Sequence, residues 1–486
     1  MDPRGGAPGR DRLSALPVDV LLLILLRLDT ATAGRTSVLS HHWRRIWALL
    51  PELRFPADAD LRLVASALAA HEAAISYLDV RALDAAPESV EACLALAADR
   101  LSGRLVFRNR VSPGGNADGD GETGGFHLPC LDKATAVSLD LGFLGLAVPT
   151  TGVFARLTEL SLLHVRLRCS SWGLSDAVSS RRCPCLQKLS IDYARGLANL
   201  TIESQSLLEL NLQGVDGLQQ LIIAARALNK LHLIHSSVAD GGPLVAVIST
   251  PQLVSLGWVD LYGSTSILLG NWPRLENLHS SFNVYSLHDS WINHGFLRLL
   301  KRFQFIRHLH ITLLYLKDIG NFQYAMEDLT KLPCLTSLSI MVRHNGHAFG
   351  ASLFHMLRIC SDLKMLVLSL HNQVNCIVPD PCPSGCVCDQ QPSDWKTEDL
   401  TLNCLQAVSI DMEGSDHQVA FVKRLLTWAV VLKIMCINFD CSMSECKVKE
   451  LRQTLSSFAR PETSVKFYMF QNEGMKFSGT KYRLAP

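Results

Sequence analysis

Apolar residues fill almost every position between Val20 and Leu28, within a segment that reads LSALPVDVLLLILLRLDTATAGRTSVLSHHWRRIWALL from Leu13 to Leu50. The segment predicts three short helices, and the first, Pro17 to Leu28, is apolar nearly all round. A helix of this kind must be covered on more than one side. About 40 residues are too few to bury all of these side chains internally. The pattern therefore predicts a small helical module that docks onto a partner.

A six-residue pattern, L-x-x-L-x-L, recurs through the middle of the chain. Close copies begin at Leu157, Leu186, Leu197, Leu207, Leu218 and Leu228, and weaker copies at Leu253, Leu275, Ile306, Leu335, Leu363 and Leu405. The last three positions alternate inward, outward and inward, as a strand packed on one face requires. No copy can bury its leucines alone, whereas stacked copies can. The repeats predict a solenoid with leucine ladders inside and a concave strand face outside.

The spacing of the copies changes along the chain. From Leu186 to Leu228 the steps are 11, 10, 11 and 10 residues, which predicts two strands in each turn of the stack. Elsewhere the steps are longer and leave room for a helix in each repeat, with candidates at Phe322–Thr330 and Ala351–Ile359. The alternative is an unrelated α/β domain with leucine-rich strands, which would need many chance matches to one template.

The remaining segments complete an α+β architecture. Helices are expected at Asp60–Ile75, Pro87–Arg100 and His417–Ala429, strands at Tyr77–Arg81, Arg104–Arg108, Leu432–Phe439 and Val465–Phe470, and a further helix behind a capping box of Ser442 and Glu445. We expect a disordered start at 1–11, the helical module at 12–55, the irregular α/β repeat solenoid at 56–403 and a C-terminal cap at 404–486. Two loops interrupt the solenoid, a glycine-rich acidic one at 112–125 and a cysteine-rich one at 376–392.

Composition narrows the class of protein. Hydrophobic residues make up 48% and charged residues 19%, which is typical of a globular protein. The formal net charge is +1, so the overall charge does not favour binding to nucleic acid or to acidic membranes. No apolar run approaches the ~18 to 20 residues of a membrane span. The 15 cysteines are mostly scattered singly in apolar runs, as at Cys93, Cys334, Cys360 and Cys436. Such spacing favours reduced, core-filling thiols in the cytosol or nucleus over a disulfide framework.

A secretory signal peptide is the alternative interpretation of the N-terminus. Arg4, Arg10 and Arg12 precede the leucine run, and Ala31-Thr32-Ala33 resembles a cleavage site. The charges at Asp19, Arg27 and Asp29, together with Pro17 and Trp43, fit a folded helical module better.

The N-terminal module resembles the F-box, which docks onto the Skp-family adaptor of cullin-RING ubiquitin ligases. The matching residues are Leu13, Leu16-Pro17, Val20-Leu21, Ile24-Leu25, Leu28, Arg35, Ser37-Val38-Leu39-Ser40, Trp43-Arg44 and Trp47. The stretch LQAVSIDMEGSDHQVAFVKRLLTWAVVLKIMCINFD resembles the FBD motif that ends many plant F-box proteins. An F-box, leucine-rich repeats and an FBD-like tail follow in that order over nearly the whole chain. Gly34 departs from the pattern, because a larger apolar residue is common there.

The resemblance implies which residues meet the adaptor. The expected contacts are Leu16, Pro17, Leu21, Ile24, Leu25 and Leu28, with Val38, Leu39, Trp43 and Trp47 either contributing or holding the module together. Residues Leu22, Leu23 and Leu26 fit the core as readily as the interface. From the residues themselves, Asp29 or Thr30 is expected to cap the second helix, and Trp43, Ile46, Trp47 and Leu50 to form one stripe of the third.

The sequence gives little support for catalysis. Cys376, Cys382, Cys386 and Cys388 lie close enough to bind zinc, but their spacing is not the paired C-x2-C arrangement, so a reactive thiol pair or an inert loop are the alternatives. Histidines recur near strand ends at His232, His235, His308, His310, His344 and His347, without an acid and a nucleophile at defined spacing. No dinucleotide-binding, phosphate-binding or hydrolase motif occurs. We therefore expect no cofactor and no enzymatic activity.

The expected function is that of a non-catalytic substrate receptor. The F-box would hold the adaptor, and through it the cullin, while outward positions of the strands hold an unidentified target protein. The candidate target contacts are Glu209, Asn211, Asn229, Lys230, His232, His308 and His310. The alternative is an adaptor-binding or stand-alone scaffold without ubiquitination targets.

Overall fold

The computed structural model describes most of the chain. The described residues are 16–56, 58–112, 124–167, 172–235, 244–260, 266–286, 293–320, 322–370, 382, 386–390, 393–440, 443–471 and 480–483. The predictions for residues 1–11 and for Cys376 lie outside them, as does most of the loop at 112–125. Ser442 itself is not described, although the helix that it was predicted to cap is. The chain divides into two compact units, unit 1 with Met1–Asn229, His235–Gln252 and Ser266–Asn271, and unit 2 with Lys230–Ile234, Leu253–Thr265 and Trp272–Pro486.

The N-terminal module is helical, as predicted. It contains α1 (Val18–Leu25), α2 (Thr30–Arg35), the 3-10 helix η1 (Thr36–Val38) and α3 (His41–Trp47). Helix α1 ends at Leu25 rather than at the predicted Leu28. Asp29, one residue after Leu28, has an extended backbone because it caps the next helix, α2. The Asp29 carboxylate accepts a hydrogen bond of 2.8 Å from the Thr32 amide, which confirms the predicted cap.

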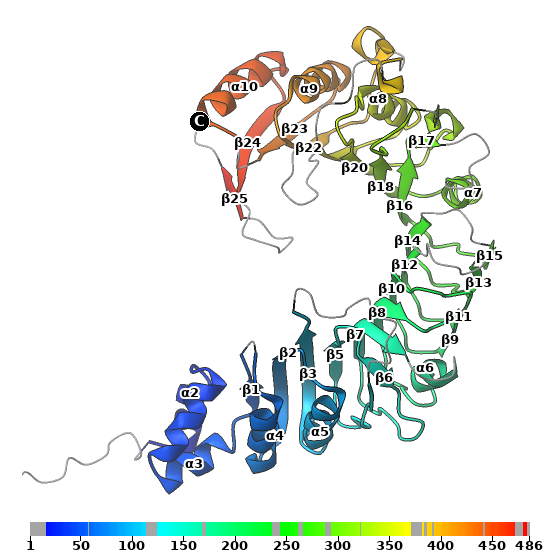
Figure 1. Cartoon of the computed structure of the whole chain (residues 1–486). Coiled ribbons are helices and arrows are strands. Elements are labelled where there is room, and N and C mark those ends of the chain that lie inside the picture. The colour runs from blue at the N-terminus through cyan, green and yellow to red at the C-terminus, as the bar shows by residue number, and fades with distance from the viewer. Residues whose placement is uncertain are drawn as a thin grey trace, which may run out of the picture. The chain divides into compact units, whose positions relative to one another are not determined.

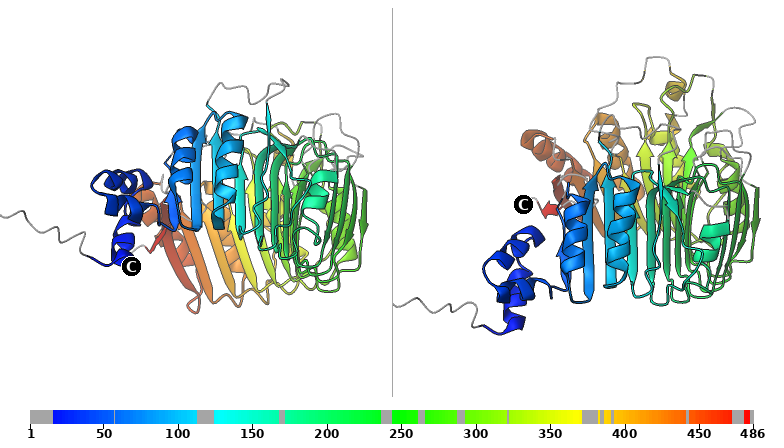
Figure 2. Two further views of the ribbon diagram at one scale, coloured as in Figure 1. Left: turned by 90° about the horizontal axis from the view of Figure 1, so that it is seen from below. Right: turned by 60° about the horizontal axis from the view of Figure 1, so that its bottom comes forward.

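Unit 1 contains a ladder of parallel strands. Its order is β1 (Glu52–Arg54), β2 (Ile75–Leu83), β3 (Leu101–Arg110), β5 (Ala136–Asp140), β7 (Glu159–Leu167), β8 (Lys188–Arg195) and β10 (Glu209–Gln213). Strand β1 lies inside the range predicted for the helical module, yet it pairs with β2. Helices α4 (Leu61–Ala70) and α5 (Pro87–Ala98) pack side by side against this ladder (Figure 2). The short strands β4 (Gly125–His127) and β6 (Gly145–Ala147) and helix α6 (Trp172–Ala177) complete the unit's first turns.

Unit 1 contains a second parallel sheet, so the copies that begin at Leu186, Leu197, Leu207 and Leu218 alternate between two sheets. It consists of β9 (Asn199–Ser204), β11 (Gln220–Ala225), β13 (Val245–Ser249) and β15 (Ser266–Leu269). Leu221 of β11 is aligned with Leu200 of β9 and with Ala246 of β13, so each turn repeats the register of the one before. Strands β13 and β15 are absent from the sequence prediction.

Unit 2 contains a second run of parallel strands. The strands are β12 (Lys230–His235), β14 (Ser255–Asp260), β16 (Asn277–Asn283), β18 (His308–Leu314), β20 (Ser337–Arg343), β21 (Met365–Ser369), β22 (Ala407–Met412), β23 (Ile434–Phe439) and β24 (Ser464–Gln471), and β25 (Thr480–Arg483) adds an antiparallel strand. The helices are α7 (His294–Arg302), α8 (Gly350–Arg358), α9 (Asp416–Trp428) and α10 (Glu445–Phe458). Figure 1 shows α8, α9 and α10 on one face of the neighbouring strands. Among the described residues, no helix has the length and apolarity to cross a bilayer.

Two local predictions in unit 2 are wrong. Residues 322–330 do not form a helix; they form the short strand β19 (Gln323–Tyr324), paired with β17 (Tyr285–Ser286), and a single 3-10 turn, η2 (Met326–Asp328). The cap of α10 is Ser444, whose hydroxyl accepts a hydrogen bond from the Lys447 amide, rather than the predicted Ser442. The predicted helix at Ala351–Ile359 is confirmed as α8.

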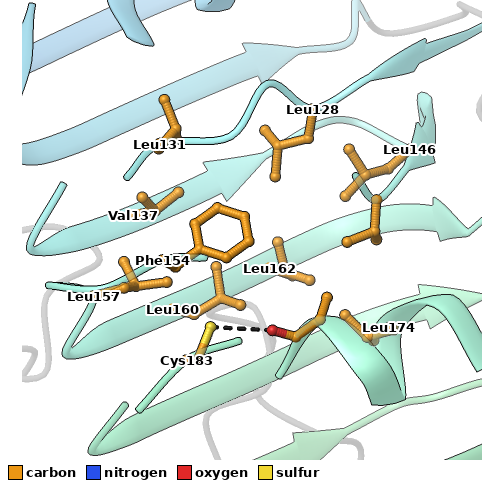
Figure 3. A pocket seen from close by; sticks show the side chains of 12 residues that line it. Leu128, Leu131, Val137, Leu146, Phe154, Leu157, Leu160, Leu162, Leu174 and Cys183 are labelled. Carbon is orange, nitrogen blue, oxygen red and sulfur yellow. Dashed lines mark hydrogen bonds between the residues drawn. The ribbon is translucent and has the colours of Figure 1, made fainter. Parts of the chain in front are cut away.

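Leucine ladders form the core of each unit. In β8 Leu189 and Ile191 are buried while Ser190 between them is half-exposed, and the other repeat strands alternate in the same way. In unit 1 the inward side chains surround a small apolar pocket lined by Leu128, Leu131, Val137, Leu146, Val148, Phe154, Leu157, Leu160, Leu162, Leu174, Ala177 and Cys183 (Figure 3).

Several cysteines are core residues, as predicted, but not all of those named. Burial raises the pKa of Cys93 and of Cys360 to about 12, which keeps both thiols protonated and unreactive near neutral pH. Cys334 is exposed and Cys436 half-buried, which corrects their assignment to the core. Cys334 precedes the first inward leucine of its repeat by one residue, so its side chain points to solvent.

Candidate functional site

The N-terminal module exposes an unusual number of large apolar side chains. Its apolar surface consists of Leu16, Val18, Val20, Leu23, Ile24, Leu26, Leu28, Val38 and Leu39. The most exposed are Val38 at 83%, Leu39 at 70% and Leu23 at 64%. Groups of exposed apolar side chains on soluble proteins mark interaction sites more often than chance.

The structure divides the predicted adaptor contacts into two sets. Leu16, Pro17, Ile24, Leu28, Val38 and Leu39 are exposed. Leu21, Leu25 and Trp43 are buried inside the chain, with exposed fractions of 0%, 1% and 7%. Leu21 and Leu25 are one helical turn apart, so they share the face of α1 that the module covers itself. These three side chains are therefore core residues in this structure and are not available on the surface of the module.

The positions that the sequence left open are now placed. Leu23 and Leu26 are exposed, whereas Leu22 is half-buried. Trp47 is also half-buried, and its indole lies beside Gly34, where an added Cβ would come within 3.3 Å of Trp47 Nε1. Gly34 therefore leaves the space that this ring fills.

The outward positions of the unit 1 strands form a polar network. Asn211 donates hydrogen bonds to Ser190 Oγ at 2.9 Å and to Asp192 Oδ1 at 2.7 Å on the neighbouring strand. Glu209 lies 3.8 Å from the ammonium group of Lys188. Glu209, Asn211 and Asn229 are all half-exposed, and the first two already have partners within the sheet.

The outward positions of unit 2 bring three histidines together. His279 of β16 is aligned with His310 of β18, and their rings stack with centroids 5.0 Å apart. The His232 ring lies over Gly257 of β14, which is itself aligned with His279. Burial lowers the pKa of both His279 and His310, so both rings are neutral near pH 7. Lys230 and His308 are exposed on the same strands.

His279 was missed by the sequence prediction. It occupies the outward position of the copy beginning at Leu275, but this copy ends in Ser280 instead of an apolar residue. A comparison of the residues at the outward position of every repeat would have identified His279.

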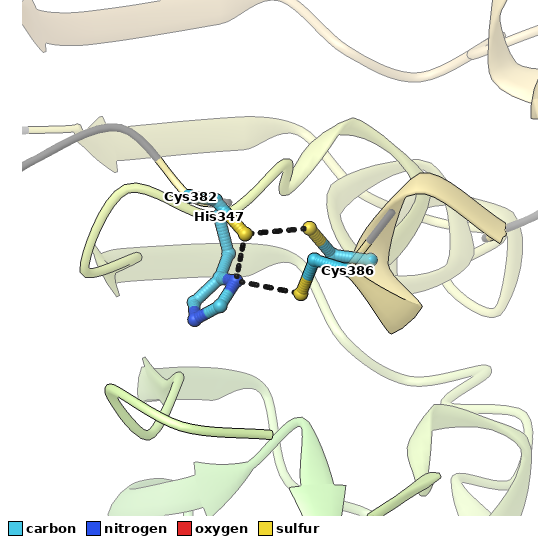
Figure 4. Close-up of side chains that lie close together, drawn as sticks. His347, Cys382 and Cys386 are labelled. Carbon is cyan, nitrogen blue, oxygen red and sulfur yellow. Dashed lines mark hydrogen bonds between the residues drawn. The ribbon is translucent and has the colours of Figure 1, made fainter. Parts of the chain in front are cut away.

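Three of the four candidate metal ligands lie together. The sulfur atoms of Cys382, Cys386 and Cys388 and one nitrogen of His347 all lie within 4.8 Å of one another (Figure 4). His347 was singled out in the sequence only as one of a histidine pair, and His344 does not belong to this group.

Comparisons with known proteins agree with this organisation. The F-box domain family matches residues 13–55, and the family described as "FBD-associated F-box protein At5g56370, LRR repeats" matches residues 125–311. These ranges cover the helical module with its apolar surface and the parallel strands from β4 to β18. The resemblance of residues 404–486 to the FBD stays a prediction.

Curated relatives come from Arabidopsis thaliana. The putative F-box/FBD/LRR-repeat protein At4g03220 is 26% identical over 270 residues, which cover 53% of each chain. F-box/FBD/LRR-repeat protein At3g52680 is 50% identical over 50 residues, 10% of this chain and 11% of that protein, and F-box protein At1g60400 is 56% identical over 45 residues, 9% and 11%. The chain thus spans about half the length of the first relative and about a tenth of the other two. With a match to the F-box domain family at its N-terminus and a match to the leucine-rich repeats of FBD-associated F-box proteins behind it, the chain is similar to the plant F-box/leucine-rich-repeat proteins.

Proposed function

We propose that this chain is a substrate-recognition subunit of an SCF-type cullin-RING ubiquitin ligase. The observation that carries the proposal is the module's apolar surface, which lies within the segment that matches the F-box family. An F-box generally binds a Skp-family adaptor, and through the adaptor the chain would join the cullin. F-box/leucine-rich-repeat proteins are typically non-catalytic, and we assign this chain no reaction of its own.

The repeats would carry the target protein. In this proposal the strands of both units belong to an irregular leucine-rich-repeat solenoid whose inward leucines fill the core. The outward side chains then form the target surface, with Glu209, Asn211, Asn229, Lys230, His232, His308 and His310 as candidate contacts. These positions are half-exposed or exposed, which is what a binding surface on the sheet requires.

The mechanism would be proximity. A target held on the repeats stays close to the ubiquitin carrier, so an intermolecular encounter becomes an intramolecular one at high effective concentration. The chain then needs no nucleophile and no general base, and we propose that it works in the cytosol or the nucleus without nucleic acid, membrane or cofactor.

The proposal predicts that two exposed side chains of the module control adaptor binding. The double variant Val38→Asp/Leu39→Asp should weaken binding of a plant Skp-family adaptor at least tenfold, because each apolar side chain removed from water contributes about 1.5 to 3 kcal/mol. Both side chains are exposed in the free chain, so the variant should fold normally. The measurement is co-purification and titration of the full chain with the adaptor.

The matched control is Leu63→Asp. Leu63 is 69% exposed on α4, outside the F-box segment, and its replacement introduces an aspartate, one against the two of the double variant, without touching the proposed interface. Equal binding by the wild type and the double variant would reject this surface. Absence of binding by a folded wild-type chain would reject the ligase assignment and leave a leucine-rich scaffold.

A further inference from the structure

A cluster of three thiols and one imidazole in unit 2 lies outside the residues proposed for adaptor and target binding. Its members are Cys382, Cys386, Cys388 and His347. They come from two parts of the chain, since His347 lies in the turn between β20 and α8, whereas the cysteines lie before and within the 3-10 helix η3 (Val387–Gln390). His347 and Cys388 are buried, with exposed fractions of 4% and 3%.

The turn that contains His347 has a defined backbone conformation. Asn345 and Gly346 both adopt the left-handed conformation, with φ of 45° and 86°, which reverses the chain directly before His347. The His347 amide donates to the His344 carbonyl at 2.8 Å, and the Asn345 side chain donates to the Tyr315 carbonyl at 2.7 Å. The backbone of the turn is therefore held on both sides of the reversal.

The His347 ring is fixed in the orientation that a metal ligand needs. Its Nε2 lies 3.0 Å from the carbonyl oxygen of Leu316, so this nitrogen carries the proton and donates. The ring stacks on Tyr315 at an interplanar angle of 20°. This leaves the lone pair of Nδ1 pointing at the thiols (Figure 4). Metal-binding histidines almost always donate their other ring nitrogen to a carbonyl or carboxylate in this way.

Three of the six separations among these ligand atoms lie near the edges of a tetrahedron around zinc, and all six are within 4.8 Å. Zinc–sulfur bonds of ~2.3 Å and zinc–nitrogen bonds of ~2.0 to 2.1 Å imply ligand separations of roughly 3.8 Å between two sulfurs and 3.6 Å between sulfur and nitrogen. The sulfurs of Cys382 and Cys388 are 3.6 Å apart. His347 Nδ1 lies 3.5 Å from the Cys386 sulfur and 3.1 Å from the Cys382 sulfur.

We propose that Cys382, Cys386, Cys388 and His347 bind a zinc ion as a closed structural site. Binding releases the three thiol protons, and three thiolates, one neutral imidazole and Zn2+ leave a net charge of −1 on the site. All four positions are taken by protein atoms, so the ion has no open position for catalysis. The Ala348 amide, which hydrogen-bonds to the Cys388 sulfur, would stabilise the thiolate charge.

The ion would fasten the cysteine-rich insertion to the repeats. Among the described residues just after the insertion, Trp395 is 4% exposed and packs against Gly350 at the start of α8 and against Phe421 of α9. Arg424 of α9 also donates to the Trp395 carbonyl at 3.3 Å. Zinc would hold Cys382, Cys386 and Cys388 to the β20–α8 turn. The ion would therefore restrict the motion of η3 relative to that turn. This role does not depend on adaptor binding.

The test is the zinc content of the full chain. The chain, purified under reducing conditions with a tag that binds no metal and exposed to zinc before gel filtration, should retain one zinc ion by elemental analysis. Replacement of zinc by Co2+ should give the intense visible absorption of a tetrahedral thiolate site. Cys386→Ser should lower the affinity at least about tenfold, whereas Cys334→Ser, an exposed thiol of the same unit, should leave it unchanged.

Two further measurements separate the site from a general effect on folding. His347→Cys replaces one ligand by another and should retain zinc, whereas His347→Ala should lose it. Removal of zinc from the wild type should speed hydrogen exchange at residues 386–390 and in the β20–α8 turn, but not in β22. A folded, reduced wild type without zinc, a disulfide among these cysteines in its place, or equal zinc in Cys386→Ser and Cys334→Ser would each overturn the proposal.

Discussion

Acidification from pH 7 to pH 4 should lower the free energy of unfolding of the region around α8, and His417 alone should account for at most about 3 kcal/mol of the loss. Burial lowers the pKa of His417 from 6.5 to about 4, with a smaller contribution from the nearby charge of Lys396. The unfolded chain therefore binds a proton below pH 6.5 that the folded chain does not accept until about pH 4. Stability is complete above pH 6.5 and falls progressively towards pH 4.

The contacts of His417 explain why the folded chain resists this proton. Its Nε2 accepts hydrogen bonds from the amides of Phe349 at 3.3 Å and Gly350 at 3.1 Å, at the N-terminus of α8. Protonation would remove the lone pair that accepts both bonds and would place a positive charge at the positive end of the helix dipole. The rings of Phe349 and Trp395 pack around the imidazole and limit its access to water.

The variant His417→Gln tests this account. A glutamine oxygen can accept the same amide hydrogen bonds without titrating, so stability at pH 7 should change less than the slope of stability against pH between 6.5 and 4. The measurement is denaturant unfolding followed by tryptophan fluorescence at several pH values. His127→Gln, at a histidine whose side chain is 79% exposed, is the control and should keep the wild-type slope. Identical slopes in all three proteins would show that His417 does not govern the acid response.

Most of the strands could be predicted from the sequence, and two of the exceptions, β13 and β15, share one cause. Every copy of L-x-x-L-x-L contains or immediately precedes a strand, because two inward leucines on alternate positions suffice to anchor one. Strands β13 and β15 read VAVIS and SILL, and the first places Ala246 and Ile248 inward without the leading leucines of the template. Their register with β11 comes from stacking on a turn that is already formed, which a local pattern cannot reveal.

The candidate sites could be predicted only where they are local in sequence. The F-box residues follow one helix and its neighbours, yet the pattern did not separate Leu21 and Leu25, which are buried, from Ile24 and Leu28, which are exposed. A helix that is apolar all round carries no signal for which side its own module covers. The proposed zinc ligand His347 lies 35 residues before Cys382. Only the stacking of β20 on its neighbours brings the two together.

Replacing Gly103 by alanine should destabilise unit 1 by about 3 kcal/mol or more. An added Cβ would lie 1.9 Å from the carbonyl oxygen of Ser76 and 2.7 Å from its carbonyl carbon, which are backbone atoms of the neighbouring strand. The pairing of β2 with β3 shifts register between Ile75 and Tyr77, so Gly103 lies in an irregularity that brings the two backbones unusually close.

The backbone at this point has little freedom to move away from a methyl group. Hydrogen bonds hold both strands, since the Ser76 amide donates to the Pro51 carbonyl at 2.8 Å and the Thr135 amide donates to the Gly103 carbonyl at 2.9 Å. A shift of β3 that relieves the clash must therefore stretch or break pairing with the strands on either side. Because β2 also pairs with β1 and β3 also pairs with β5, the loss should spread to β1 and β5.

The measurement is the midpoint of denaturant unfolding of Gly103→Ala, with Gly295→Ala as the matched control. Gly295 lies in α7, where an added Cβ meets only Trp258 Nε1 at 3.4 Å, an ordinary contact. Alanine is the better helix former there, so this control should be neutral or stabilising by about 0.5 kcal/mol. Equal midpoints for the two variants would mean that β2 and β3 do not approach each other as closely as the structure has them. A large loss of stability in Gly103→Ala alone would show that the close contact between β2 and β3 is needed to hold these strands together.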